Sequence, residues 1–101
     1  MPTDVKVAFY RIAQEALNNV VKHARANQVN VRLRCEKGTV ELEIADDGKG
    51  FDPGEVSAEH HGMRIMRERA EAIGAQFQVN SEPGHGTQVL LAWAAEESQP
   101  R

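Results

Sequence analysis

The sequence predicts an α+β fold of two layers, in which helices cover one face of a mixed, mostly antiparallel sheet. Two apolar patterns with helical spacing and two pairs of alternating segments indicate this class. The 101 residues, 41% of them hydrophobic, are enough for a single small core. Residues 1–95 are expected to form one domain that lacks its N-terminal part, and residues 96–101 a disordered tail.

The first helix is predicted between Val5 and Ala24, with Thr3 or Asp4 as its cap. Apolar residues recur there at intervals of three and four, which is typical of an amphipathic helix. They are Val5, Phe9, Ile12, Ala13, Ala16, Leu17 and Val20.

Strict alternation then predicts a half-buried strand with Val29, Val31, Leu33 and Cys35 on its apolar face. A turn at residues 37–38 leads into a second strand, whose apolar residues are Val40, Leu42 and Ile44. In this hairpin, Arg32 faces Glu43 and Arg34 faces Glu41 on the solvent side, which favours the register.

A loop without periodicity extends from Asp46 to about Gly62 and is typical of a mobile lid. The second helix follows, and Gly74 is placed to end it. Its apolar residues are Met63, Met66, Ala70 and Ile73. Two alternating strands joined around residues 83–86 complete the pattern, with Phe77 and Val79 on one and Val89, Leu91 and Trp93 on the other.

Composition excludes several classes of function. The net charge of -3 comes from interspersed acids and bases, so the chain has no basic block for nucleic acid. The single cysteine cannot form an internal disulfide, and neither a membrane-spanning run nor a signal peptide is visible. We therefore expect a cytoplasmic domain without membrane contact. Zinc-ligand spacing is also absent.

Four polar residues follow the apolar face of the first helix: Glu15, Asn19, Lys22 and His23. At helical spacing their side chains form one stripe beside the core. Mg²⁺ prefers oxygen ligands and shares those of substrate phosphates, so the Asn19 carbonyl is a sufficient protein ligand. Lys22 would reach the same phosphates, and Glu15 could hold a metal-bound water or accept a proton. The alternative is a solvated helix face with i,i+4 contacts.

Residues 46–52 combine an acidic pair with two glycines at the end of an apolar strand. There the Asp46 carboxylate can accept a hydrogen bond from an exocyclic amine, such as N6 of adenine. Gly48 and Gly50 would let the backbone pass close to a flat base. The alternative is an ordinary Asp-Gly turn.

Gly62 begins the second helix, so free backbone N–H groups of residues 62–64 could bind phosphate oxygens; the alternative is a helix start with a basic surface. The adjacent His60 and His61 lack a third ligand, which favours loop residues over a metal site. Residues 84–87 either form a plain hairpin turn or place the Thr87 hydroxyl beside Asp46 across the sheet.

The order of these motifs resembles the ATP-binding catalytic domain of bacterial sensor histidine kinases, within the superfamily of DNA gyrase, Hsp90 and MutL. Residues 11–24 resemble the family's N box and residues 46–50 its G1 box. Residues 62–70 resemble its G2 region, and residues 84–87 its closing glycine-threonine motif. Glu15 and the Met-Arg-Glu-Arg run at residues 66–69 are similar to the subfamily that pairs with nitrate-regulator-type response regulators, including nitrate/nitrite sensors.

The resemblance implies a fold of the Bergerat type and a set of nucleotide-binding roles. Asn19 would be the Mg²⁺ ligand, Lys22 would contact phosphate, and Asp46 would bind adenine N6. The other residues implied at the nucleotide are His23, Gly48 and Gly50 near the base, His61, Gly62 and Met63 at the phosphates, and Thr87 behind the adenine. Glu15 matches the catalytic Glu of gyrase-type ATPases and would act as a base or orienting group. Residues 60–62 read His-His-Gly where many relatives have Gly-x-Gly.

The resemblance also implies partners that this sequence does not contain. The phosphoacceptor-histidine helix and the usual strand before the first helix are absent, so the chain would bind ATP or ADP and need a histidine from a separate dimerisation domain. A response regulator would act through that domain, and the isolated chain would be a monomer. The full protein could be anchored to a membrane. Two alternatives are a nucleotide-binding module without kinase activity and a serine kinase or ATPase of the anti-sigma or gyrase kind.

Overall fold

The computed structural model describes residues 1–50 and 61–95, apart from the side chains of His23, Ala24 and His61. Two α-helices alternate with two hairpins, in the predicted order of helix, hairpin, helix and hairpin. Their bounds are α1 Thr3–Asn19, η1 Val20–Ala24, β1 Val29–Glu36, β2 Thr39–Asp46, α2 His61–Ala72, β3 Gln76–Ser81 and β4 Thr87–Ala94. The predicted lid and tail fall mostly on residues outside this description.

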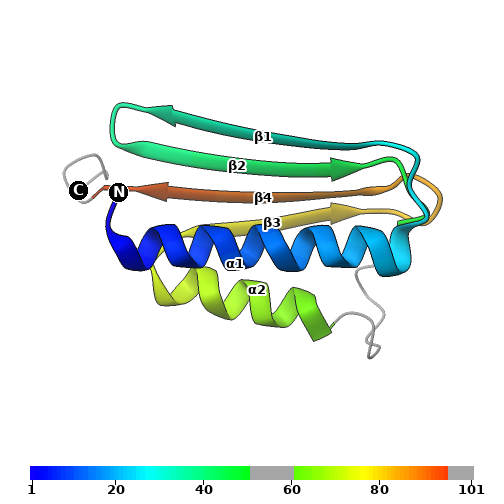
Figure 1. Ribbon diagram of the computed structural model, residues 1–101, viewed down its shortest axis with the longest axis horizontal. Helices are drawn as coiled ribbons and strands as arrows, with labels where there is room; N and C mark the ends of the chain where they lie inside the picture. The colour runs from blue at the N-terminus through cyan, green and yellow to red at the C-terminus, as the bar shows by residue number, and fades with distance from the viewer. Residues whose placement is uncertain (51–60, 96–101) are drawn as a thin grey trace.

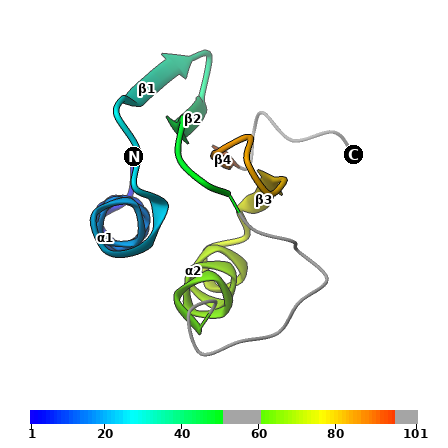
Figure 2. The same cartoon turned by 90° about the vertical axis from the view of Figure 1, so that its right-hand side faces the viewer.

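The sheet has the strand order β1-β2-β4-β3, and every pair of neighbouring strands is antiparallel. Both helices lie on the same side of it, as Figures 1 and 2 show. The α+β two-layer prediction is therefore confirmed. The described sheet is wholly antiparallel, where the sequence suggested a mixed one.

A single apolar cluster joins the two layers. It contains Val5, Phe9, Ile12 and Ala16 of α1, Val40, Leu42 and Ile44 of β2, Met66 and Ala70 of α2, and Val89 and Leu91 of β4. Ile12 and Met66 are completely buried, which places the centre of the core between the helices and the two central strands. Leu17 of α1, predicted in the apolar stripe, is 38% exposed.

The start of α1 differs from the prediction, whereas the end of α2 matches it. Pro2 occupies the N-cap position of α1 and no side chain caps this helix, so the capping role predicted for Thr3 or Asp4 is wrong. Asp4 instead accepts a hydrogen bond from the N–H of Val5. Gly74 has φ +71° just after α2, which confirms the predicted helix end.

The first hairpin has the predicted register but not the predicted burial. Arg32 faces Glu43 and Arg34 faces Glu41 across a turn in which Lys37 and Gly38 both have positive φ. Every residue of β1 is nevertheless exposed, including Leu33 at 59% and the free Cys35. The half-buried strand prediction is wrong because β1 is an edge strand beyond the reach of either helix (Figure 2).

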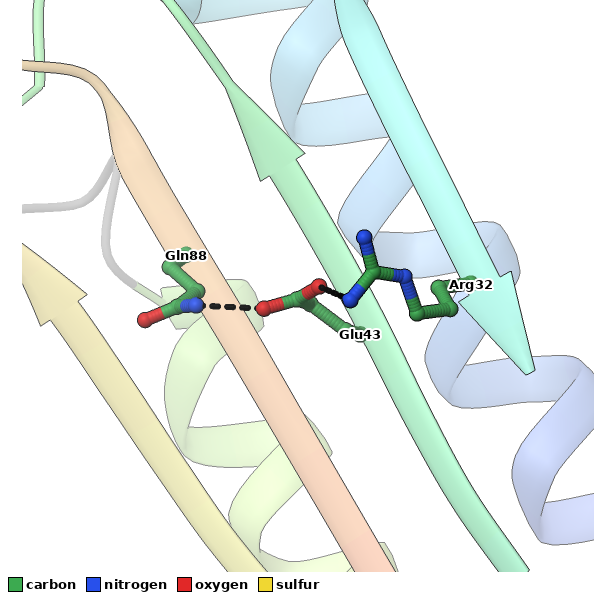
Figure 3. Close-up of polar contacts among 3 residues, drawn as sticks. All are labelled: Arg32, Glu43 and Gln88. Carbon is green, nitrogen blue, oxygen red and sulfur yellow. Dashed lines mark hydrogen bonds and ion pairs between the residues drawn. The ribbon is translucent and has the colours of Figure 1, made fainter. Parts of the chain in front are cut away.

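On the face of the sheet away from the helices, polar side chains are linked to one another across the strands. Arg32 forms an ion pair with Glu43 at 3.8 Å, and Glu43 accepts a hydrogen bond from the side-chain amide of Gln88 (Figure 3). Asn80 then donates to Gln88 at 3.0 Å and accepts from Gln78 at 3.2 Å. The predicted Arg32–Glu43 pair is confirmed, whereas Arg34 makes its ion pair with Glu36.

Candidate nucleotide-binding site

The polar stripe of α1 meets the start of α2. A Cβ atom on Gly62 would overlap Oε1 of Glu15 and lie 3.3 Å from Nδ2 of Asn19. Gly62 therefore lets the backbone of α2 approach these side chains more closely than any other residue would allow. The structure thus brings Gly62 against Glu15 and Asn19, which belong to a distant part of the sequence.

Asn19 has a buried polar atom without a partner. Its Nδ2 is the one buried side-chain nitrogen or oxygen, among the described residues, that makes no hydrogen bond. Buried amides are nearly always paired, so such an atom needs an explanation. Because the two ends of a carboxamide are assigned from their hydrogen-bond partners, the unpaired group offers either an N–H donor or an oxygen ligand. An oxygen ligand suits a hydrated cation, and an N–H donor suits the phosphate oxygens around that cation.

Lys22 follows in η1, a π-helical segment that extends α1. Its side chain is exposed and has no ion pair among the described residues, so it is available for an anion. Single π-helical turns inside helices are frequent at functional sites. The side chains of His23 and His61 lie outside the described part of the chain, so their predicted contacts remain predictions.

Asp46 is the last residue of β2, as the sequence suggested, and stands opposite Thr87 of β4. Its Oδ1 accepts a hydrogen bond from the N–H of Gly48 at 2.8 Å. The register therefore pairs the two residues across the sheet, while a position of the Thr87 hydroxyl beside the Asp46 carboxylate stays a prediction. The Thr87 hydroxyl is also 2.8 Å from the hydroxyl of Ser81, which in turn donates to the carbonyl of Gly86.

Two glycines allow the segment after Asp46 to pack against the turn between β3 and β4. A Cβ on Gly50, which has φ +63°, would overlap the Glu82 carbonyl, and one on Gly86 would overlap the Asp46 carbonyl. The N–H of Gly84 donates to the carbonyl of Lys49 at 2.6 Å. The Gly-His-Gly motif is therefore more than a hairpin turn, because it supports the segment that holds Asp46.

Asp47, next to Asp46, makes backbone contacts that the sequence reasoning missed. Its carboxylate accepts hydrogen bonds from the N–H groups of Gln28, at 2.9 Å, and of Asn27, at 2.8 Å. These bonds hold the pKa of the Asp47 carboxyl below its usual value. The signal available was the acidic doublet at residues 46–47, in which only one carboxylate had an assigned task.

Met63 is half-buried and packs against the core, so its side chain is structural and its backbone belongs to the first turn of α2.

Arg64 forms an i,i+4 ion pair with Glu68 at 3.9 Å, and the Arg67 guanidinium lies 5.3 Å from the centre of the Phe77 ring. No group of three or more His, Cys, Asp or Glu residues suited to a metal occurs among residues 1–50 and 61–95. None of the described helices has the length and apolar character to cross a membrane.

Comparisons with known proteins, by sequence and by structure, both point to one protein family. Residues 4–97 match the family described as histidine kinase-, DNA gyrase B-, and HSP90-like ATPase. The sensor histidine kinase LiaS of Bacillus subtilis is 42% identical over 80 residues, which are 79% of this chain and 22% of LiaS. The sensor protein VraS of Staphylococcus haemolyticus is 37% identical over 89 residues, 88% of this chain and 26% of VraS.

A solved structure supports the same conclusion. The histidine kinase domain of a blue-light activated kinase from Erythrobacter litoralis has a TM-score of 0.75 and 25% identity, covering 93% of this chain and 46% of that one. The chain spans about a quarter of the length of the curated relatives LiaS and VraS. Because the family model covers nearly the whole chain and the fold agrees, the chain belongs to the histidine kinase-, DNA gyrase B-, and HSP90-like ATPase family.

Proposed function

We propose that this chain binds ATP with Mg²⁺ and presents the γ-phosphoryl group to a histidine on a separate phosphoacceptor domain. The observation that carries this proposal is the unpaired, buried amide of Asn19 beside Gly62 at the start of α2. A buried carboxamide next to the first turn of a helix suits a metal–phosphate ligand. The names of relatives such as LiaS, a sensor histidine kinase, agree with this chemistry.

The site divides into a phosphate side and a base side. On the phosphate side, Asn19 would hold Mg²⁺, Lys22 would contact the phosphates, and the backbone of Gly62 and Met63 would lie beneath them. Bound Mg²⁺ would supply neutralisation of the phosphate charge. Glu15, against Gly62, would orient or deprotonate the attacking group. His61, the first residue of α2, completes the proposed set on this side.

On the base side, the carboxylate of Asp46 would accept the exocyclic amine of adenine. Its Oδ1 already accepts from Gly48, which leaves Oδ2 for the base. Gly48 and Gly50 would allow close approach of the ring, with Thr87 behind Asp46 and His23 nearby. Catalysis would then come mainly from positioning, since transfer needs the γ-phosphoryl group in line with the acceptor histidine.

The remaining assignments concern the full-length protein. We propose a cytoplasmic location, a monomeric state for this segment, and a response regulator of the nitrate-regulator type that acts through the phosphoacceptor domain. Glu15 in the first motif and the Met-Arg-Glu-Arg run at residues 66–69 support that subfamily. Residues 96–101 are proposed as a tail outside the domain.

Calorimetry with ATP and ADP tests the binding proposal. We expect Mg²⁺-dependent binding by the natural chain and loss of adenine recognition in Asp46→Ala, because the acceptor for N6 is removed. Asp4→Ala is a matched control, since Asp4 lies in the first turn of α1 and contacts only its neighbour among the described hydrogen bonds. No nucleotide binding by the natural chain, or equal binding by Asp46→Ala, would contradict the proposal. Binding without transfer to an added acceptor domain would favour the non-kinase module.

A further inference from the structure

Asp47 connects two segments that carry opposite sides of the proposed site. Its carboxylate accepts hydrogen bonds from the N–H groups of Asn27 and Gln28, and its own N–H donates to the Gln28 carbonyl at 3.2 Å. Residues 27–28 follow η1, which carries Lys22, and Asp47 itself follows Asp46. Three hydrogen bonds thus join the segment that follows the phosphate-side helix to the base-side strand end.

These bonds reach the connection between η1 and β1 just after a residue with an unusual backbone conformation. The chain leaves η1 through Arg25, which has φ +51°, a conformation that non-glycine residues rarely adopt. A residue in this region persists only where its surroundings hold it there. The Asp47 carboxylate, which binds two successive N–H groups just beyond Arg25, provides such a restraint.

Residues 49–50, which follow Asp46 along the chain, are held by separate contacts with the turn between β3 and β4. Gly50 and Gly86 allow close contact with the turn between β3 and β4, and Lys49 accepts a hydrogen bond from Gly84. That contact positions the base side within the sheet. The link from the base side to η1 is made elsewhere, by the pairing of Val29 with Asp46 and by the bonds of Asp47 to the two residues just before Val29.

We propose that Asp47 is a positioning residue that sets the spacing between the adenine-binding and phosphate-binding halves of the site. This inference rests on the proposed function. A ligand that spans both halves needs the correct spacing, whereas a ligand of one half does not. Misplacement by about 1 Å can reduce the rate of a positioned reaction by about a hundredfold, and a ligand held at both ends depends on the same geometry.

The test compares three ligands on the natural chain and its Asp47→Ala variant: ATP with Mg²⁺, adenosine alone, and tripolyphosphate with Mg²⁺. Titrations followed by NMR chemical shifts measure the weak ligands. We expect the affinity for ATP to fall by about 10- to 100-fold in Asp47→Ala, with adenosine and tripolyphosphate each changed by less than about threefold. Asp47→Asn should retain the affinity for ATP, because its Oδ1 can accept the same two N–H groups.

Two further variants keep the result interpretable. Asp47→Glu keeps the charge but displaces the carboxylate by one methylene, so it should weaken ATP selectively even if Asp47→Ala does not fold. Glu71→Ala removes an exposed negative charge on α2 and should leave all three affinities unchanged. Equal losses for all three ligands, or unchanged ATP affinity in both Asp47→Ala and Asp47→Glu, would overturn the inference. Failure of the natural chain to bind ATP would instead overturn the proposed function, and the inference with it.

Discussion

At Gly62 the backbone of α2 lies directly against the side chain of Glu15, and no φ restriction requires glycine there. The constraint is therefore steric, and it can be separated from backbone strain. We expect Gly62→Ala to lower the free energy of unfolding by about 1 kcal/mol or less, because the methyl group overlaps only the carboxylate end of the Glu15 side chain, which can rotate away. Urea denaturation of both single variants and of Gly62→Ala/Glu15→Ala measures this cost. The double variant should recover part of it; an equal cost with and without Glu15 would contradict the steric explanation.

Asn19 and its neighbour Asn18 provide a matched pair on α1. Asn18 is exposed, whereas Asn19 has the buried, unpaired amide. Asn19→Ala should weaken the Mg²⁺ dependence of ATP binding and reduce phosphoryl transfer to an added acceptor domain by at least about a hundredfold, since positioning and charge neutralisation would be lost. Asn18→Ala should transfer at the natural rate. Transfer assayed with labelled ATP checks both, and an active Asn19→Ala variant would remove Asn19 from the proposed mechanism.

At the scale of elements, the two strands of the first hairpin differ in what covers them. Leu33 and Leu42 are directly opposed, yet they are 59% and 6% exposed respectively. Leu42→Ala should therefore lower the free energy of unfolding by about 2–5 kcal/mol. Leu33→Ala should change it by about 0.5 kcal/mol or less. Chemical denaturation of the two variants makes this comparison, and similar costs would mean that β1 is as well packed as β2.

This hairpin also shows where sequence reasoning succeeds and fails. Alternation assigns Leu33 and Leu42 to the same face, and the opposition of Arg32 and Glu43 predicts the register correctly. Alternation cannot reveal how far a helix extends over the sheet, so the burial of β1 was overestimated. For the same reason, periodicity placed Asn19 and Asp46 correctly on their elements but gave no sign of the backbone contacts that Asp47 makes. Those contacts depend on how distant segments meet.

At the scale of the whole molecule, one apolar cluster connects both helices to the central strands. A small domain with one core is expected to unfold in a single transition. The fluorescence of Trp93, the sole tryptophan, and far-UV circular dichroism should therefore give the same denaturation midpoint. Met66→Ala, which truncates a fully buried side chain of α2, should lower both midpoints equally, at a cost of about 2–5 kcal/mol. Separate midpoints would mean that α2 unfolds independently of the sheet.

The exposed thiol of Cys35 gives this molecule a built-in point for attaching a reporter. Cys35 is the sole cysteine and faces Val40, whereas Asp46 lies six residues further along β2. At about 3.3 Å per residue, a dye on Cys35 would sit about 20 Å from Asp46, at the opposite end of the hairpin. Labelling would need no added or removed cysteine, and energy transfer to a fluorescent nucleotide analogue would then report occupancy directly.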